Sequence, residues 1–221
     1  MAKLVWDSTG ERWYENGVRN VALYVRNGAS GAYSSAVAWN GVTAITENPD
    51  GAEPTDLYAD DIKYASFRST ETYGLTIEAY QYPESFGLCD GTAEPATGVF
   101  LGQQKRIEFA LVWKTQIGND TKDDSDDAYK LHIAYGLSAS PSEKNYETIN
   151  DSPDAITFSW ECESDPVAVT GYKPVSCITI DSRTANATKL TALETTLFGS
   201  SSTDGALVLP DAVITAMSGT T

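Results

Sequence analysis

The side chains best suited to chemistry are sparse in this chain, and their spacing builds no catalytic site. His132 is the only histidine, and it stands near Lys130 in the middle of an alternating, strand-like segment. A serine or cysteine nucleophile needs a base held beside it, and no nucleophile motif accompanies His132. We therefore interpret His132 as an ordinary polar residue on a strand. A single histidine also excludes a histidine-cluster metal centre.

The three cysteines, Cys89, Cys162 and Cys177, form no redox or zinc pattern. Their number is odd and no C-x-x-C pair occurs, which argues against a disulfide framework and against a zinc site. Cys162 and Cys177 both fall on strand-like segments and could meet by chance. Free cysteines are usually buried as small hydrophobic residues, so we expect all three to be reduced.

The acidic residues offer two further possibilities. The loop at 119–127 reads NDTKDDSDD, and its carboxylates are ligands that calcium accepts. It lacks the glycine and closing glutamate of an EF-hand, so a solvated, self-repelling loop is the better interpretation and a weak cation site the alternative. Two spaced carboxylates could also hydrolyse glycosides, but among 31 acidic residues some pair always looks suitable. No glycine-rich phosphate loop occurs. We expect no enzyme, no metal and no cofactor.

Aromatic residues interleaved with charge raise a third possibility, a face on which sugars or bases stack. Trp39, Tyr64, Tyr80 and Trp113 are the examples. Most of them lie in phase with aliphatic neighbours, so the sequence favours packing in the core.

The composition limits the classes of partner. The chain has 221 residues and a formal net charge of −16, which argues against neutralising nucleic-acid phosphates and against docking on anionic membranes. The N-terminal stretch has no apolar core typical of a signal peptide, and no apolar run is long enough to span a bilayer. We expect a protein that is made in a cytoplasm.

Period-two alternation predicts a sheet of about a dozen strands, because successive side chains of a strand point to opposite faces. The clearest segments are 75–82, 105–117, 129–135 and 156–162. Residues 57–68 form two short segments divided at Asp60-Asp61. Near the N-terminus, turn residues at 15–17 separate a strand at 12–14, which pairs with 4–6, from one at 18–26.

Helical signals are few. Asn186 can cap a helix whose leucines recur at helical spacing until Gly199. Pro83 can begin a short helical turn, and Pro210 breaks the apolar segment 206–217. The sequence thus predicts an all-β sandwich or partial barrel with one flanking helix near residues 186–198. We expect a single domain, 1–221, with residues 182–221 packed on it.

Short pieces in the same order across nearly the whole chain match one family. They are VAWNGVT (37–43), GAEP (51–54), LYADDIKY (57–64), TIEAY (76–80), YP (82–83), CDG (89–91), GQQ (102–104), IGND (117–120), YKLH (129–132), NDSP (150–153), YKP (172–174) and IDS (180–182). On these residues the chain resembles the major tail tube proteins of bacteriophages with long, non-contractile tails, the group common in phages of Gram-positive hosts. One departure is Ser164-Asp165-Pro166, where two threonines are expected before the Pro-Val.

The resemblance implies a structural virion protein that is not an enzyme. Such proteins form hexameric rings that stack into a hollow tail tube, through which DNA passes during ejection into the host. Neighbouring subunits join their strands into a barrel around the channel, and the DNA passes without specific binding. The implied partners are further copies of the chain, a tape-measure protein, a tail terminator and tail-tip proteins. The implied location is the virion tail, after synthesis in the bacterial cytoplasm.

Within that framework, the polar faces of the best strands are candidates to line the channel. An acidic lumen would repel DNA of the same sign and would offer no sticking points. The candidate lumen residues are Thr76, Glu78, Glu108, Lys114, Lys130 and His132. The candidate inter-ring contact is the acidic loop with Asp120, Asp123, Asp124, Asp126 and Asp127. The alternative from another class is a β-sandwich that binds carbohydrate without catalysis, on a surface or secreted protein.

Overall fold

The predicted sheet is present, and the all-β prediction is confirmed. The structure, a computed structural model, describes residues 4–27, 31–121, 128–148 and 155–218. Its main sheet has eight antiparallel strands in the order β2-β1-β9-β10-β11-β6-β3, with β12 also against β10. The strands are β1 (Trp13–Val25), β2 (Val37–Ala38), β3 (Val42–Glu47), β6 (Gly74–Ala79), β9 (Phe109–Asn119), β10 (Tyr129–Ala139), β11 (Phe158–Ser164) and β12 (Cys177–Asp181).

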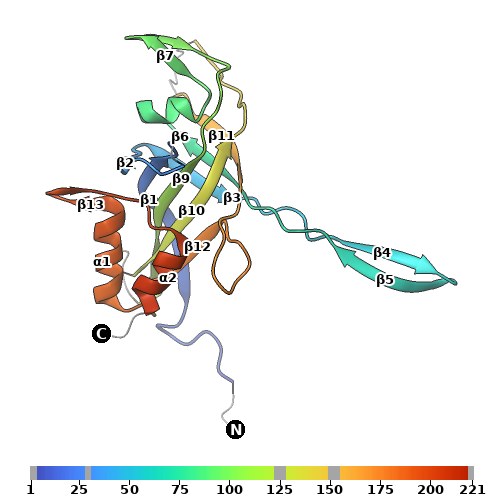
Figure 1. Ribbon diagram of the computed structural model, residues 1–221. Coiled ribbons are helices and arrows are strands. Elements are labelled where there is room, and N and C mark those ends of the chain that lie inside the picture. The colour runs from blue at the N-terminus through green and yellow to red at the C-terminus, as the bar shows by residue number, and fades with distance from the viewer. Residues whose placement is uncertain (1–3, 28–30, 122–127, 149–154, 219–221) are drawn as a thin grey trace.

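The sheet curls until its two ends meet. β2 and β3 are the outermost strands of the order, yet they are consecutive in the chain and joined by a tight corner. At this corner the Trp39 amide donates to the Val21 carbonyl on β1 at 2.8 Å, and the Tyr80 amide after β6 donates to the Gly41 carbonyl at 2.9 Å. The corner therefore links both ends of the sheet and makes a partial barrel (Figure 1).

A bend in β10 lets two strands share one edge. β10 pairs with β12 over Lys130–Ala134 and with β11 over Leu137–Ala139. Between them Gly136 has φ 58°, and a Cβ there would lie 2.2 Å from the Asp165 carbonyl oxygen. Only glycine combines this backbone conformation with so close an approach.

The interior of the barrel is filled with aromatic side chains. Trp160 of β11 and Phe109 of β9 are fully buried around Phe86. Phe86 belongs to the 3-10 helix η1 (Glu84–Leu88), which follows Pro83 as predicted. The Phe86 ring lies 5.0 Å from the Trp160 ring and 5.3 Å from the Phe109 ring, both edge to face. Such contacts add stability beyond the burial of area.

A second core lies on the outer face, beneath α1 (Ala187–Phe198) and α2 (Pro210–Ser218). The Tyr24 hydroxyl donates to the Leu197 carbonyl at 2.6 Å, and the Tyr135 hydroxyl donates to the Val208 carbonyl at 2.9 Å. The central strands β9 and β10 are thus buried on both faces. Every Phe109–Trp113 side chain is buried, those of Phe109, Leu111 and Trp113 in the barrel and the others under the helices.

The helix expected at 186–198 is confirmed, because the Asn186 side chain accepts from the Lys189 amide at 3.1 Å and Gly199 follows the last turn. The sequence predicted one flanking helix, but the described residues also form a second one, α2. Pro210 begins α2 instead of breaking the segment. Proline is tolerated there because the first helical N–H has no partner within the helix.

The predicted turn at 15–17 is also wrong. β1 runs unbroken from Trp13 to Val25, and its pairing with β9 shifts register between Asn16 and Arg19 and again between Arg19 and Ala22. Gly17 and Asn20 have positive φ, so the turn-type residues make β-bulges within the strand. The predicted strand at 4–6 is not a strand in the structure.

Two hairpins project from the barrel (Figure 1). β4 (Pro54–Ala59) and β5 (Ile62–Arg68) form a long arm, and its turn lies at Asp60-Asp61 as predicted. β7 (Ala93–Ala96) and β8 (Val99–Leu101) form a short hairpin at one end of the body. A third pair, β13 (Gly199–Ser200) and β14 (Thr203–Asp204), follows α1.

Candidate assembly surfaces

The β4–β5 arm is a largely exposed part of the described chain. Figure 1 shows it extending sideways, away from the barrel and both helices. Its two strands form a separate sheet and, among the described residues, pair only with each other. Its large apolar side chains are open to solvent: Leu57 45%, Tyr58 71%, Ile62 63%, Tyr64 73% and Phe67 61% exposed. A two-stranded ribbon is marginally stable by itself, and grouped apolar exposure is typical of a binding surface.

The base of the arm is held firmly. The Asp50 and Thr72 amides each donate to the other's carbonyl, at 2.9 and 2.8 Å. Next to this bridge Gly51 has φ 86°, and a Cβ there would lie 2.6 Å from the Thr70 carbonyl oxygen. The two segments that lead into the arm therefore leave the body in close contact, at a position that requires glycine.

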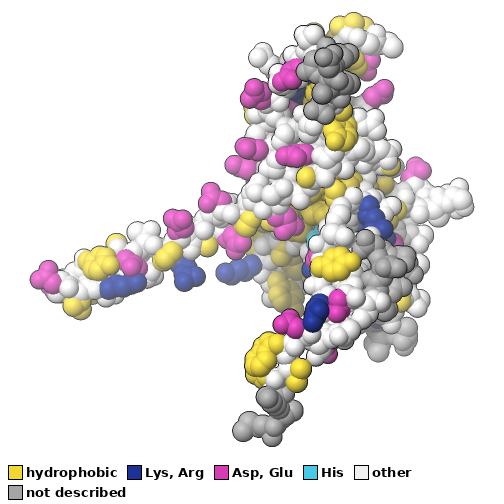
Figure 2. Space-filling view, turned by 180° about the vertical axis from the view of Figure 1, so that it is seen from behind, with side chains coloured by type: hydrophobic (Ala, Val, Ile, Leu, Met, Phe, Trp, Pro, Cys, Tyr) yellow, Lys and Arg dark blue, Asp and Glu magenta, His cyan; other side chains and the backbone are white. Residues whose placement is uncertain are grey.

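A second surface is the outer face of β3, β6 and β11. Glu78, Glu161 and Glu163 are exposed there. In register, Ser159 lies opposite Glu78, and Glu161 lies opposite Thr76. Seen from behind, acidic side chains recur along the body and the arm (Figure 2). Among the described strands, β3 pairs only with β6, so its other edge offers backbone groups to another strand.

The structure does not bring the six predicted lumen residues together. Thr76 and Glu78 share the outer face of β6, where the Thr76 hydroxyl accepts from the Asn48 side chain at 2.7 Å. Glu108 is paired with Arg26 near the start of β9. Lys114 lies on the helix side of β9, 2.9 Å from Glu194 of α1.

Lys130 and His132 belong to a polar cluster at one end of the barrel. His132 is only 8% exposed, and its ring stacks on Trp113 at 5.1 Å. Its Nε2 lies 2.9 Å from the Thr115 hydroxyl, and its Nδ1 lies 3.2 Å from the Thr179 hydroxyl. Lys130 pairs with Glu15 of β1. His132 lies in a covered polar cluster and not on an open strand face, because both faces of β10 are covered in the subunit.

The polar groups of the cluster are hydrogen-bonded to one another. Thr115 donates its hydroxyl proton to Glu15 at 2.5 Å, so this proton is not directed to His132. Burial lowers the pKa of His132. Burial works to raise the pKa of Glu15, but hydrogen bonds from Lys130 and Thr115 bring it below its usual value. The cluster ties β1 to β9 and β10, where Glu15 faces the side chains of both strands.

The predicted acidic contact loop is described only at its start. The Asp120 side chain accepts from the Gly10 amide at 2.9 Å, and the Arg12 guanidinium lies 3.9 Å away from it. Asp120 thereby holds the segment before β1 against the end of β9. Asp123, Asp124, Asp126 and Asp127 lie outside the described residues.

The cysteines are free, as expected. Burial raises the pKa of Cys89 and of Cys162 to about 12, so both thiols are protonated at neutral pH. No group of three or more histidine, cysteine or acidic residues that could hold a metal occurs in the described part of the chain.

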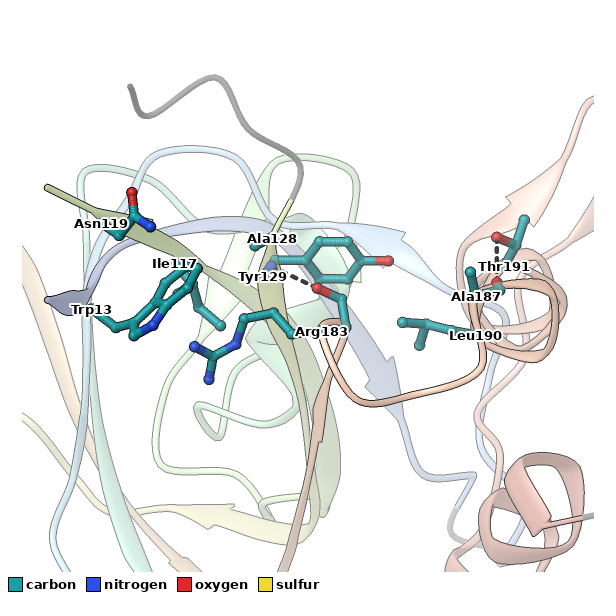
Figure 3. A pocket seen from close by; sticks show the side chains of 11 residues that line it. Trp13, Ile117, Asn119, Ala128, Tyr129, Arg183, Ala187, Leu190 and Thr191 are labelled. Atoms are coloured by element: carbon teal, nitrogen blue, oxygen red, sulfur yellow. Dashed lines mark hydrogen bonds between the residues drawn. The ribbon is translucent and has the colours of Figure 1, made fainter. Parts of the chain in front are cut away.

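A pocket of about 490 Å³ lies where β1, β9, β10 and α1 meet. Figure 3 shows Trp13 and Arg183 on one side and Leu190 with Thr191 on the other. The Arg183 guanidinium lies over the Trp13 ring at 4.9 Å and is held by Asp181 at 2.6 Å. The sequence carries no signal for this site, because its residues come from four separate segments with no shared motif.

The aromatic prediction holds for two residues of four. Trp39 and Trp113 are buried, whereas Tyr64 and Tyr80 are 73% and 54% exposed. Alternation placed Tyr64 in phase with Ile62, but it gave no sign that this strand has no core to face.

In the described residues, no helix combines the length and apolar character needed to cross a bilayer. Neither the protein-family models nor the curated proteins contain a match to this chain.

Proposed function

We propose that this protein is a structural subunit that polymerises as stacked hexameric rings into the tail tube of a long-tailed bacteriophage. The observation that carries the proposal is the β4–β5 arm, a two-stranded ribbon with five large apolar side chains in solvent. The exposed arm adds to the family resemblance of the sequence, and the ring and the tube in the proposal come from that resemblance.

The arm is difficult to explain in a protein that acts alone. Burying apolar area stabilises by about 25 cal/mol per Å², and the arm gains little of this from its own chain. A second copy can cover the arm at every subunit of a ring, because cyclic symmetry repeats the same contact until it closes. The edge of β3 that pairs with no described strand gives a second place where identical copies can continue one sheet.

The acidic outer face suits a channel for DNA. We assign Thr76, Glu78, Glu161 and Glu163 to the lumen, since they share the sheet face that the helices leave uncovered. Duplex DNA carries one negative charge per ~1.7 Å of its axis, so a wall of like charge repels it. Salt limits this repulsion to ~8–10 Å from the wall. In this proposal α1 and α2 face outward.

The remaining parts of the proposal follow from the resemblance. The tube would lie in the virion, and its other partners would be a tape-measure protein, a tail terminator and tail-tip proteins. DNA would pass through without specific binding, and the subunit would have no catalytic role.

Electron microscopy of the concentrated, full-length protein tests the proposal. We expect rings or tubes from the wild type and only folded single subunits from the double variant Tyr64→Ser/Phe67→Ser. Tyr172→Ser is the matched control, because Tyr172 is 75% exposed but lies in the loop before β12. It should assemble normally.

Single wild-type subunits at every concentration would contradict the proposal. If such subunits were instead retained on a polysaccharide column, the carbohydrate-binding alternative would replace it.

A further inference from the structure

The short β7–β8 hairpin ends the body in an apolar tip. Val99, Phe100 and Leu101 are 50%, 63% and 49% exposed. The Glu94 carboxylate accepts from the Gly98 amide at 2.8 Å and so braces the turn that presents them. The tip is therefore a defined projection, and its only charged residue is Glu94.

The pocket described above lies at the other end of the body. In Figure 1 the β7–β8 hairpin stands at one extreme of the barrel, and the starts of β1 and α1 lie toward the opposite one, near the N-terminus. The pocket wall combines apolar Trp13, Ile117 and Leu190 with polar side chains and with Arg183, which is paired with Asp181. Its volume of about 490 Å³ is within the ~300–1,000 Å³ typical of sites that accept a bound group.

The tip and the pocket both present apolar side chains at opposite ends of the body. One is an apolar projection, and the other is a hollow with apolar walls whose guanidinium is already paired with Asp181. The tip and the pocket lie on different surfaces of the same chain. A two-fold dimer uses one and the same surface patch on both copies, so it cannot bring tip and pocket together. A projection that fits a pocket elsewhere on an identical molecule makes a head-to-tail contact, which continues without closing when the copies are related by translation along an axis.

We propose that Phe100 of one copy inserts between Trp13 and Leu190 of the next copy along the tube. This inference rests on the proposed function and names the surfaces by which rings stack. The β4–β5 arm then serves contacts of a different kind, since it projects sideways from the line that joins tip and pocket.

The first test replaces the inserted side chain. Full-length Phe100→Ser should form rings or very short stacks in place of long tubes, with an unchanged circular dichroism spectrum because Phe100 is in solvent in the single subunit. Phe100→Leu keeps an apolar group and should restore stacking. Tyr172→Ser removes another exposed aromatic residue, outside the tip and the pocket, and should give tubes of normal length.

The second test traps the contact. Phe100→Cys combined with Ala187→Cys places one thiol at the tip and one at an exposed lining residue of the pocket. A short bis-maleimide should link assembled copies into an open-ended covalent ladder, whereas a contact within a ring would stop at the ring. Phe100→Cys with Thr215→Cys, an exposed site on α2 outside the pocket, is the control, and wild-type protein measures the background from Cys177.

The outcomes separate the two proposals. Wild-type protein that forms neither rings nor tubes contradicts the proposed function. Wild-type tubes with Phe100→Ser tubes of the same length overturn the stacking contact alone. So do assembled Phe100→Cys/Ala187→Cys tubes that link no more than the Thr215→Cys control.

Discussion

The barrel and the β4–β5 arm use the same alternating pattern with opposite results. In β9 the alternating residues reach two cores, and Phe109 to Trp113 are all buried. In β5 the alternation covers only Ile62, Lys63 and Tyr64, and Ile62 and Tyr64 remain in solvent. An alternating pattern thus specifies a strand and its two faces, but not whether the chain itself supplies the side chains that those faces contact.

The largest effect should come from the centre of the barrel. Trp160→Ala removes a fully buried ring that contacts Phe86 and Trp39, and we expect a loss of about 3–5 kcal/mol in the free energy of unfolding. Urea denaturation followed by circular dichroism measures it. A loss below about 1 kcal/mol would show that the aromatic cluster is not the core of the fold.

A smaller effect should come from the helix cap. Asn186→Ala removes the acceptor of the Lys189 amide and should cost about 1 kcal/mol, as N-cap substitutions usually do. Asn186→Asp is the matched control, because it keeps an oxygen acceptor and should leave the urea midpoint almost unchanged. Equal losses in both variants would contradict the cap.

Acid should weaken the barrel through its polar cluster. Burial lowers the pKa of His132 in the folded state from 6.5, so the unfolded chain binds more protons just below that pH. Stability from this group is present above pH 6.5 and is lost as pH falls toward the folded pKa. The pKa of Glu15 is also lowered, from 4.5, so its contribution is lost further down the scale.

Urea midpoints measured between pH 8 and pH 5, limits chosen as roughly 1.5 units on either side of the usual histidine value, check the effect. His132→Gln should flatten the pH dependence in that range. An unchanged slope in the variant would assign the acid sensitivity to other groups.

The smallest effect on stability should come from the arm. Ile62→Ser and Tyr64→Ser remove side chains that are 63% and 73% exposed, so each should change the free energy of unfolding by less than about 0.5 kcal/mol. The same substitutions should reduce assembly. A loss of stability comparable to that of Trp160→Ala would remove the distinction between arm and barrel.

The sequence predicted best where one local signal sufficed. Alternation located β9 and β10, Asn186 and Gly199 marked the ends of α1, and Asp60-Asp61 marked the turn of the arm. It failed where the same residue type serves two structures. Gly17 within β1 belongs to a bulge and not to a turn, because the long neighbouring strand β9 keeps pairing past it.

The candidate surfaces were harder to predict, for a tertiary reason. Lys114 and His132 alternate with apolar residues, a pattern that indicated a solvent-exposed strand face. In the structure α1 covers Lys114, and the end of the barrel encloses His132. The pocket at Trp13 and Arg183 joins distant segments. The exposure of the arm depends on the absence of a covering element, which no local pattern records.

The close approach at Gly51 has a consequence for the direction of the arm. Gly51 has φ 86°, and a Cβ there would lie 2.6 Å from the Thr70 carbonyl oxygen. Even an alanine would therefore force the two segments at the base of the arm apart. A small rotation at the base of the arm displaces the turn at the far end of the arm by the greatest distance, because the arm is long. If copies join through this arm, the absence of a side chain at Gly51 fixes the angle between neighbouring copies. That angle in turn sets the curvature of the assembly.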